Sequence, residues 1–466
     1  MGLTMAKLLQ DTCMRYSITL LDRGTAVADA TSSSSSRLIP HPRSYALSPK
    51  SLNLIGTDVC SKLPLGEYDS MQIWEANSPA MLVFSNKHDL YEKEQQQQPN
   101  CLGACVEDSA LVSALQGLLN RDSIRYQTTL KDISFHHHPH TNKIEVTTAP
   151  TTNPADDASS DQARRGSSTF TTDLVIAADG AQSPVRTKLG IGWKGLEYGR
   201  TAATFTVELS QSNNNKRAYQ RFLPHGPIAL LPTYSDSHAV VVWSTTPAEA
   251  ALLKSMDSSS LTKLLNETLQ QGPQRLKPLL ERVGQTDPFS SLLYGMERVL
   301  DTVHYGMGMR HWSDDPETFA APPMIASVPS ESPRFTFPLS CKMASQFVHH
   351  HHPSSNHRVA LIGDAAHTVH PMAGQGLNIG LEDVAALANA IQKAHDCGME
   401  AGQFLDDYEQ NRQWNVPLKV GGIHLLHSLF GMQSAPLMHG KSIGMSMINQ
   451  FGPLRRQLAK IATGMD

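Results

Sequence analysis

Segment 358–383 restricts the possible folds of this chain more than any other part of the sequence. Residues 358–362 form an apolar run typical of a buried strand, and Gly363 and Asp364 follow it directly. A glycine-rich loop, 371–376, then leads into apolar residues at helical spacing. A plain strand–turn–helix needs no acid, His-Pro pair and Gly-Gln-Gly run in this order. The segment therefore predicts a site where backbone and a helix start approach a flat ligand.

A second acidic turn occurs earlier in the chain. The apolar run 174–178 predicts a strand that ends at Asp179 and Gly180, and Ser183 and Arg186 stand at the start of a helix. Strand–Asp–Gly turns are common, so this segment alone is moderate evidence. Together with segment 358–383 it indicates one nucleotide site built from two distant parts of the sequence.

The beginning of the chain resembles part of a dinucleotide fingerprint. Met5, Leu8 and Leu9 recur at helical spacing after Gly2, and the predicted strand 17–21 ends at Asp22. The spacing matches that between the last glycine of such a fingerprint and an acid about 20 residues further on. Only Met1 precedes Gly2, so the first strand and the earlier glycines of such a fingerprint are missing from the sequence. We therefore expect an N-terminal truncation, with a gene-model or splicing error as the preferred explanation.

The middle of the chain follows a different pattern from its two ends. Short runs of β-type residues separated by turn residues predict an antiparallel sheet at 201–209, 218–222, 228–231 and 239–244. Strands and helices alternate on either side of this region, which is typical of a parallel sheet. The expected fold class is therefore α/β: a Rossmann-like parallel sheet interrupted by a mostly antiparallel substrate domain, followed by C-terminal helices.

Composition excludes several classes of function. The 466 residues carry a formal net charge of −4 and only 18% charged residues, which gives no basis for nucleic-acid binding. Only Cys101 and Cys105 of the six cysteines lie close together, so we expect free thiols and no zinc set. No carboxylate or cysteine accompanies the histidine runs at ligand spacing, and no metal site is expected. Solvated loops are expected at the low-complexity stretches 32–36, 95–98, 151–168, 212–216 and 349–352.

At this point the motifs resemble a known family. The run Gly363-Asp-Ala-Ala-His-Thr-Val-His-Pro-Met-Ala-Gly-Gln-Gly-Leu-Asn-Ile-Gly380 and the earlier Asp179-Gly180 turn are similar to class A flavoprotein monooxygenases with the para-hydroxybenzoate hydroxylase fold. The first of these runs looks like the signature of the ubiquinone-biosynthesis branch, and the mitochondrial ring hydroxylases are the best match. Further stretches agree at 43–48, 71–75, 220–232 and 337–340.

The resemblance implies FAD as cofactor and assigns roles on its adenosine half. Asp22 would bind the adenosine ribose, Arg43 would lie beside the phosphates, and Asp179 with Gly180 would sit at the pyrophosphate. Gly2 would be the remaining glycine of the phosphate loop. Because most of that loop is not in the sequence, this chain would bind FAD weakly or not at all.

On the flavin half, the resemblance assigns Asp364 with Gly363 to the ribityl or ribose hydroxyls. Pro371 would lie beside the reactive flavin edge. The isoalloxazine ring would be lined by Gly374, Gly376, Leu377 and Asn378. The FAD-binding domain would comprise residues 1–62, 101–195 and 345–405, the substrate domain residues 63–100 and 196–344, and the helical C-terminal segment residues 406–466.

The implied reaction is hydroxylation of the aromatic ring of a prenylated phenolic ubiquinone precursor, by dioxygen, through a flavin hydroperoxide. Electrons would come from a ferredoxin-type or NAD(P)H donor. The implied location is the matrix side of the mitochondrial inner membrane, in peripheral contact with the membrane surface and with other ubiquinone-biosynthesis proteins. Two alternatives stay open: a catalytically silent homologue that serves as a structural subunit, and a hydroxylase of another phenol.

The sequence does not identify a catalytic residue. His367 and His370 flank the expected flavin loop, but packing or a bond to backbone explains each of them equally well. Arg221, Trp243 and the stretch 224–232 are expected to line the substrate face of the sheet, although Trp243 could simply belong to the core.

Overall fold

The computed structural model describes residues 1–13, 15–25, 39–76, 81–85, 101–138, 141–151, 167–212, 216–272, 320–349, 359–369 and 375–431. Several sequence predictions lie outside these ranges, among them Pro371, Gly374 and His370 and the serine and glutamine runs. The last part of the helical segment, 432–466, also lies outside them.

The cofactor region begins with helix α1 (Gly2–Thr12), which buries Met5 and Leu9 and confirms the predicted helix. Strand β1 (Leu20–Leu21) pairs in parallel with β7 (Ile124–Arg125), so the predicted strand 17–21 is shorter than expected. The short helix η2 (Arg121–Ser123) precedes β7.

A second parallel pair consists of β11 (Val175–Ala177) and β19 (Val359–Leu361), with β18 (Val348–His349) antiparallel to β19. Among the described residues, no strand hydrogen-bonds to both this pair and the β1–β7 pair. Gly2 lies between the two pairs, because a Cβ added there would be 3.4 Å from a methyl carbon of Leu20 and 3.5 Å from Ala178.

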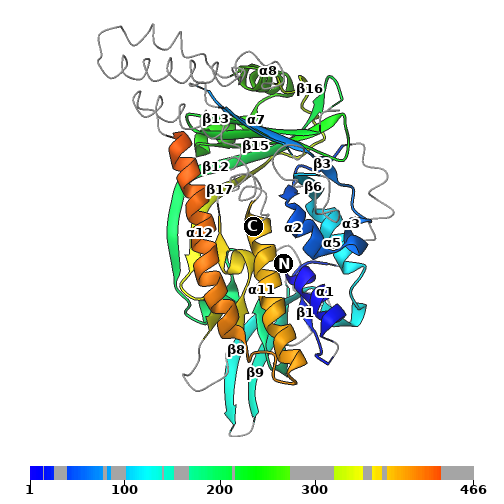
Figure 1. Ribbon diagram of the computed structural model, residues 1–466, viewed down its shortest axis with the longest axis vertical. Helices are drawn as coiled ribbons and strands as arrows, with labels where there is room; N and C mark the ends of the chain where they lie inside the picture. The colour runs from blue at the N-terminus through cyan, green and yellow to red at the C-terminus, as the bar shows by residue number, and fades with distance from the viewer. Residues whose placement is uncertain are drawn as a thin grey trace, which may run out of the picture.

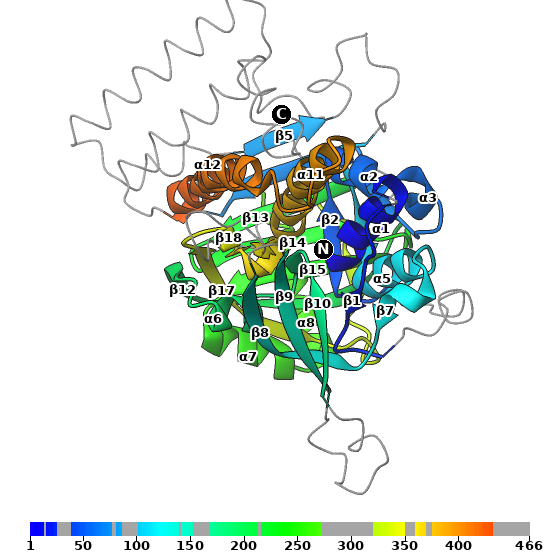
Figure 2. The ribbon, with the colours of Figure 1, turned by 90° about the horizontal axis from the view of Figure 1, so that it is seen from below.

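Two long helices cover the second parallel pair: α11 (Gln375–Asp396) and α12 (Leu405–Gly431), which pack side by side (Figures 1 and 2). Tyr408 of α12 donates to the Leu361 carbonyl at 2.6 Å, and the Glu409 carboxylate accepts from the Phe347 N–H at 2.8 Å. These bonds fix α12 to the sheet whose strand β19 leads into the Gly363–Asp364 turn.

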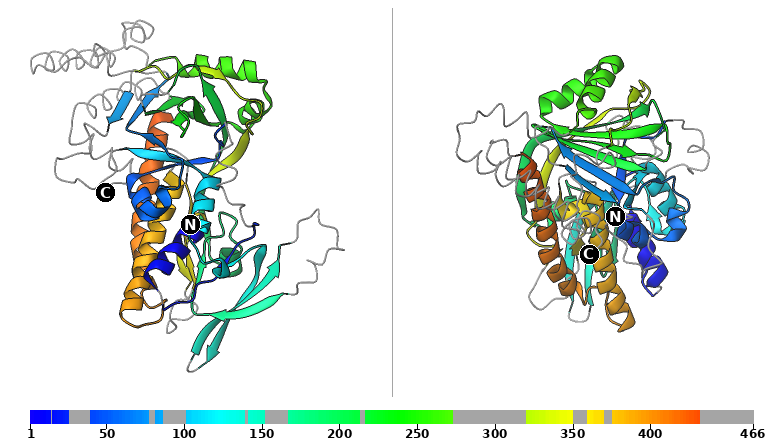
Figure 3. Two further views of the ribbon diagram at one scale, coloured as in Figure 1. Left: turned by 90° about the vertical axis from the view of Figure 1, so that its right-hand side faces the viewer. Right: turned by 45° about the horizontal axis from the view of Figure 1, so that its top comes forward.

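Smaller elements complete the cofactor region. A three-stranded sheet contains β2 (Ser44–Leu47), β6 (Gly103–Glu107) and β3 (Gly66–Tyr68), with helices α2 (Pro49–Ile55), α3 (Thr57–Cys60) and α5 (Asp108–Gln116). A second three-stranded sheet projects from the lower end of the molecule (Figure 3) and contains β8 (Thr128–His138), β9 (Thr141–Pro150) and β10 (Ser168–Thr172).

The substrate region is a nine-stranded sheet above the long helices (Figure 1). Its order is β20 (His367–Thr368), β17 (Phe335–Ala344), β12 (Trp193–Leu209), β15 (His238–Thr245), β14 (Gly226–Pro232), β13 (Arg217–Leu223), β4 (Ser70–Glu75) and β5 (Met81–Ser85), and β16 (Ile325–Ser327) also pairs with β12. All of its pairings are antiparallel except that of β13 with β4. The predicted antiparallel sheet is confirmed.

Helices α7 (Pro247–Ser255) and α8 (Ser258–Leu269) cover the face of this sheet that points away from the cofactor region. Leu261 and Leu265 of α8 pack with Phe205 of β12 in a buried cluster. The opposite face therefore looks toward the cofactor elements. The architecture confirms the predicted fold class, while the domain boundaries stay predictions.

The start of α7 allows a test of stability against pH. The Glu249 N–H donates to Thr246 Oγ1 at 3.2 Å, and the Glu249 carboxylate accepts from the Thr246 N–H at 3.3 Å, which forms a capping box. Hydrogen bonds from Thr245 first, and then from His225, lower the pKa of Glu249 from 4.5 to about 2. Because the folded-state pKa lies below the unfolded one, this stabilisation is present above pH 4.5 and is lost as the pH falls to about 2.

We expect Glu249→Gln to lower the Tm by about 2 °C at pH 7, because capping bonds contribute about 1 kcal/mol. The side chain of Glu249 is 41% exposed, so solvent screening keeps the effect small. The difference in Tm between the two proteins should shrink as the pH falls from 4.5 to about 2. Thermal unfolding followed by circular dichroism measures it, and a constant difference across this range would contradict the prediction.

Candidate functional site

Both acidic turns lie at the same edge of the β11–β19 sheet. Ala177 pairs with Leu361 in parallel register, and the Ile362 N–H donates to the Ala177 carbonyl at 3.0 Å. Asp179 and Asp364 therefore follow the carboxyl ends of neighbouring parallel strands. This edge is where ligands bind in open α/β sheets.

Arg186 joins the two turns physically. It lies in the short helix α6 (Pro184–Lys188), and its guanidinium donates to the Ala365 carbonyl at 2.8 Å and to the Ala181 carbonyl at 2.7 Å. The guanidinium also stacks on the Trp193 ring, with 3.8 Å between its carbon and the ring centroid. Burial lowers the pKa of Arg186. Because one side chain holds both turns, their relative position is fixed.

Asp179 keeps one unused acceptor. Its Oδ2 accepts from the Val185 N–H at 3.1 Å, while its buried Oδ1 has no hydrogen-bond partner in the described part of the chain. Gly180 adopts a φ of +86°, and a Cβ added there would meet nothing within 4 Å. The turn therefore combines a free carboxylate oxygen with open space beside its backbone, which suits a ligand that donates a hydrogen bond.

Gly363 and Asp364 form the other acidic turn, within the short helix η4 (Gly363–Ala365). Gly363 adopts a φ of +58°, and a Cβ added at Gly380 of α11 would lie 3.1 Å from the Gly363 Cα. The helix thus touches the turn backbone directly, which larger side chains would prevent. Asp364 retains an exposed surface. Desolvation by neighbouring protein atoms raises the pKa of its carboxyl group, and the charges of His367 and the Met1 amine oppose this rise.

The start of α1 meets both turns. Met1 is the N-cap, without a side-chain capping bond, and its side chain contacts the Gly363–Gly380 surface. Burial lowers the pKa of the Met1 α-amino group, and the carboxylates of Asp364 and Asp108 act in the opposite direction. The first N–H groups of α1 therefore lie within electrostatic range of Asp364.

Arg43 and Asp22 are predicted to serve the phosphates and the adenosine ribose of the cofactor. Arg43 immediately precedes β2, its side chain is 64% exposed, and it forms an ion pair with Asp108 at 3.2 Å. Asp22 follows β1, and its Oδ1 accepts from the Gly24 N–H at 2.8 Å. Through Asp108 the structure connects Arg43 with the start of α1. Asp22 lies in the turn that follows β1 of the β1–β7 pair.

The residues expected along the flavin ring divide into two groups. Gly376 lies at the start of α11, and a Cβ added there would be 3.4 Å from a methyl carbon of Val369. Leu377 packs against the hydrophobic cluster around β2 and β6. The side chain of Asn378 is buried against β2 and α2. Its Oδ1 accepts from the Ser48 N–H at 2.9 Å and from Ser51 Oγ at 2.7 Å, and its Nδ2 donates to the Ala46 carbonyl at 2.9 Å. Asn378 therefore anchors the helix start to β2 and α2.

These residues fit FAD on three observations. An unused buried acceptor stands at Asp179, open space lies beside the backbone of Gly180, and Asp364 keeps an exposed surface at the same sheet edge. A dinucleotide offers hydroxyl donors to the two carboxylates and a pyrophosphate to the open turn backbone.

One face of the nine-stranded sheet looks toward this site. Residues directly opposite each other in neighbouring strands share a face, and Thr204 contacts the cofactor region by donating to the Pro42 carbonyl at 3.1 Å. The register places Gln220 on the same face as Thr204, in the row Phe335, Thr204, Val242, Ala229, Gln220 and Ile73. Gln220 is 3% exposed, and its side-chain amide makes no hydrogen bond to another described residue.

Two residues expected on the substrate face belong to the opposite face. Arg221 donates to the Thr268 carbonyl and to Gln271 Oε1 at 3.1 Å, at the end of α8. Trp243 packs against the cluster that contains Leu261 of α8. Side chains alternate along a strand, so an error of one position in the prediction assigned both residues to the substrate face although they lie on the helix-covered face.

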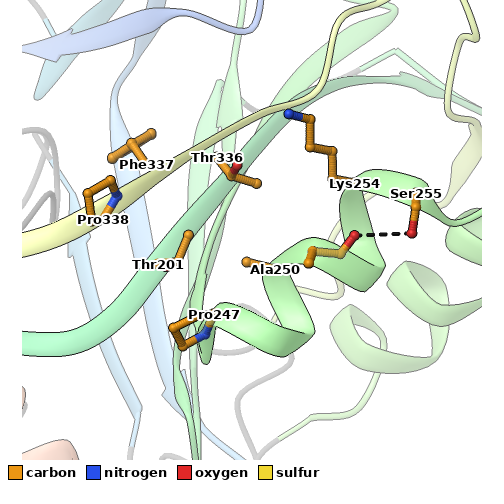
Figure 4. A pocket seen from close by; sticks show the side chains of 9 residues that line it. Thr201, Pro247, Ala250, Lys254, Ser255, Thr336, Phe337 and Pro338 are labelled. Atoms are coloured by element: carbon orange, nitrogen blue, oxygen red, sulfur yellow. Dashed lines mark hydrogen bonds between the residues drawn. The ribbon is translucent and has the colours of Figure 1, made fainter.

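A surface cavity of about 640 Å³ lies between α7 and strands β12 and β17 (Figure 4). Thr201, Pro247, Lys254 and Thr336 are among its lining residues. It lies on the α7 side of the sheet, away from both acidic turns. We assign it no part in the chemistry.

The described residues contain no group of three or more His, Cys, Asp or Glu side chains placed to hold a metal. No helix in the same ranges has the length and apolarity to cross a bilayer. All six cysteines are free thiols, as expected.

Three positions were given no role from the sequence, although the structure bonds them to the acidic turns or to each other: Arg186, Asp383 and Arg412. Arg186 was recognised only as part of a helix start. A signal did exist for Asp383, since helical spacing places it on the buried face of α11 with Gly380, Val384 and Leu387. Arg412 gives the same signal on α12, four residues after Tyr408 and four before Val416, both fully buried.

The chain matches the family described as FAD binding domain over residues 134–279 and 303–417, more than half of its length. It is 31% identical over 430 residues to "Ubiquinone biosynthesis monooxygenase COQ6, mitochondrial" of Xenopus tropicalis, covering 90% of this chain and 82% of the relative. The protein of the same name from Homo sapiens is 30% identical over 429 residues, with the same coverage of both chains.

Two solved structures share the fold of this chain. The p-nitrophenol 4-monooxygenase PnpA from Pseudomonas putida DLL-E4 matches with a TM-score of 0.61 and 15% identity, covering 99% of this chain and 95% of that one. The probable FAD-dependent monooxygenase pqsL from Pseudomonas aeruginosa matches with a TM-score of 0.59 and 16% identity, covering 96% of each chain. The fold, the two acidic turns and the sequence identity agree, and the chain belongs to the COQ6 family of FAD-dependent ubiquinone biosynthesis monooxygenases.

Proposed function

We propose that this protein is an FAD-dependent monooxygenase that hydroxylates the aromatic ring of a prenylated phenolic ubiquinone precursor. One observation carries the proposal: both acidic turns, locked together by Arg186, open at the sheet edge that faces the mostly apolar row containing Gln220. A dinucleotide cofactor and a largely apolar ring can therefore meet between them.

In this proposal, the residues at the sheet edge hold the cofactor. Asp179 Oδ1 accepts a hydroxyl hydrogen bond, Asp364 holds the ribityl or ribose hydroxyls, and the start of α1 faces the pyrophosphate. Asp22 and Arg43 serve the adenosine ribose and the phosphates, while Gly376 and Leu377 line the isoalloxazine ring, with Pro371 and Gly374 in the preceding loop. Bound FAD supplies the redox chemistry, taking electrons from a donor and passing them to dioxygen.

The protein's own part in the reaction is orientation and exclusion of water. Hydroxylation inserts one oxygen atom of dioxygen into a ring C–H bond and releases the other as water, using two electrons from the donor and two protons. Val242, Ala229 and Ile73 present apolar surface to the ring, and the Gln220 amide can bond the substrate hydroxyl. A ring held in one orientation is hydroxylated at one position.

The location follows from the curated relatives, whose names place them in mitochondria. We infer peripheral attachment on the matrix side of the inner membrane, a ferredoxin-type electron donor and association with other ubiquinone-biosynthesis proteins. Trp414 and Leu418, one turn apart on α12, are 80% and 76% exposed, which supports contact with a membrane surface.

A cofactor and turnover experiment tests the proposal. The purified chain should turn yellow with FAD and, with a reducing system and dioxygen, hydroxylate a short-chain prenylated phenol faster than a panel of soluble phenols. A folded, colourless product that binds no FAD would support the silent-subunit alternative. Faster turnover of a soluble phenol would identify a different hydroxylase.

Gln220→Leu tests the substrate face separately. The change keeps the size of the side chain but removes its only polar group, so we expect about tenfold lower turnover, the effect of one lost hydrogen bond to substrate. FAD affinity should stay unchanged, because Gln220 lies on the substrate sheet. Steady-state kinetics and FAD titration of both proteins measure the two effects, and unchanged turnover would remove Gln220 from the substrate site.

A further inference from the structure

Asp383, in the middle of α11, is completely buried, with an exposed fraction of 0%. Its Oδ2 accepts from the Gly363 N–H at 2.8 Å and lies 2.6 Å from His367 Nε2. Its Oδ1 accepts from Arg412 Nε at 2.7 Å. One carboxylate therefore binds the acidic turn, the strand after the turn and helix α12 together.

Donors surround the buried carboxylate of Asp383 on both of its oxygens. A buried carboxylate is tolerated only when donors and an opposite charge compensate for lost water. Arg412 supplies that charge and also donates to the Ile379 carbonyl at 3.3 Å. The donors on both oxygens leave the carboxylate little freedom to move.

The Gly363 bond sets the position of Asp364. Gly363 requires its left-handed φ of +58° to begin the turn, and its N–H is held by Asp383 while its carbonyl accepts from the Ala366 N–H at 2.8 Å. Asp364 is the next residue and retains an exposed surface at the cofactor edge. The direction in which Asp364 points is thus fixed from behind by a residue that does not reach the edge itself.

We propose that Asp383 is a positioning residue for FAD: it holds the Gly363–Asp364 turn in the shape that receives the flavin half of the cofactor. This inference rests on the proposed function, in which Asp364 binds the ribityl or ribose hydroxyls. Asp383 acts through Asp364 and does not touch the cofactor.

The test compares two ligands on the full-length protein. FAD reaches both halves of the site, whereas ADP carries the adenosine and pyrophosphate without the flavin half. Asp383→Asn keeps the size of the side chain and removes its charge, so the Gly363 turn loses its charge-assisted bond. We expect the Kd for FAD to rise about tenfold and the Kd for ADP to change less than about twofold.

Asp396→Asn is the matched control. It makes the same chemical change at the other end of α11, where Asp396 is exposed, accepts from Gln392 at 2.6 Å and makes no bond to the turn. Both Kd values should stay at the wild-type level. If D383N does not fold, H367Q removes the ring that supports Asp383 from the strand side, and the Kd for FAD should rise about threefold with ADP unaffected.

Isothermal titration, together with the Tm of the protein without FAD, separates the outcomes. Equal weakening of FAD and ADP would mean a general structural role and overturn the inference, as would wild-type affinity in D383N. A wild-type protein that binds no FAD would instead overturn the proposed function and this inference with it. A selective loss of FAD affinity supports both.

Discussion

Arg186→Met is expected to lower the free energy of unfolding by about 3 kcal/mol, because the buried guanidinium makes two charge-assisted hydrogen bonds. Methionine can still cover the Trp193 ring, but it leaves the Ala365 and Ala181 carbonyls without their donor. The two acidic turns then lose their only shared side chain among the described residues. We therefore also expect FAD affinity to fall by about a hundredfold.

Urea unfolding of the protein without FAD measures the first effect, and a flavin fluorescence titration measures the second. Lys188→Met is the control on the same helix, because Lys188 is exposed and makes only a surface ion pair with Asp132 at 3.4 Å. It should change the free energy of unfolding by less than about 0.5 kcal/mol. An Arg186 variant with wild-type FAD affinity would show that the turns hold their positions without the bridge.

Asn378→Leu should have an effect of similar size on the other side of the site. Leucine fills the same volume but removes three buried hydrogen bonds, and it leaves the Ser48 N–H and the Ala46 carbonyl without this partner. We expect the free energy of unfolding to fall by about 3 kcal/mol. The start of α11 is also released from β2, so FAD affinity should fall by about tenfold.

Asn389→Leu makes the same chemical change on the same helix at an exposed position. Its free energy of unfolding should stay within about 0.5 kcal/mol of the wild type. Urea unfolding and FAD titration of the two variants decide the matter. Equal stability of both would mean that the Asn378 bonds do not anchor the helix.

The elements with the strongest sequence signal were predicted well for a physical reason. Strands β11 and β19 are short apolar runs that end in an acidic turn, and both turns fall at the carboxyl edge of one sheet. Parallel strands impose that arrangement once their order is known. The helix beginning at Gln375 was predicted because its apolar residues repeat at helical spacing.

Side-chain facing within the substrate sheet could not be predicted from the sequence. Arg221 and Gln220 are adjacent in β13, and a one-residue error in parity exchanges the two faces. Arg221 is 2% exposed and binds the end of α8 rather than a group on the cofactor side. Only the register with Thr204, which touches the Pro42 carbonyl, decides which face looks at the cofactor region.

Asp383 shows a different limit. Its place on the apolar face of α11 could be read from helical spacing, and a carboxylate there requires donors. Those donors come from Gly363, His367 and Arg412, which the sequence separates by up to 49 positions. Sequence alone indicates that partners exist, whereas the fold identifies them.

The pairing of β20 with β17 has a consequence for how the protein moves. His367 and Thr368, which follow the Gly363–Asp364 turn, are edge residues of the same sheet that carries Phe335 and Gln220. The Gly363–Asp364 turn and the substrate sheet are therefore connected by the hydrogen bonds between β20 and β17 and not by a hinge. A displacement of this sheet would therefore displace the Gly363–Asp364 turn as well, so the substrate face and the cofactor turn move together.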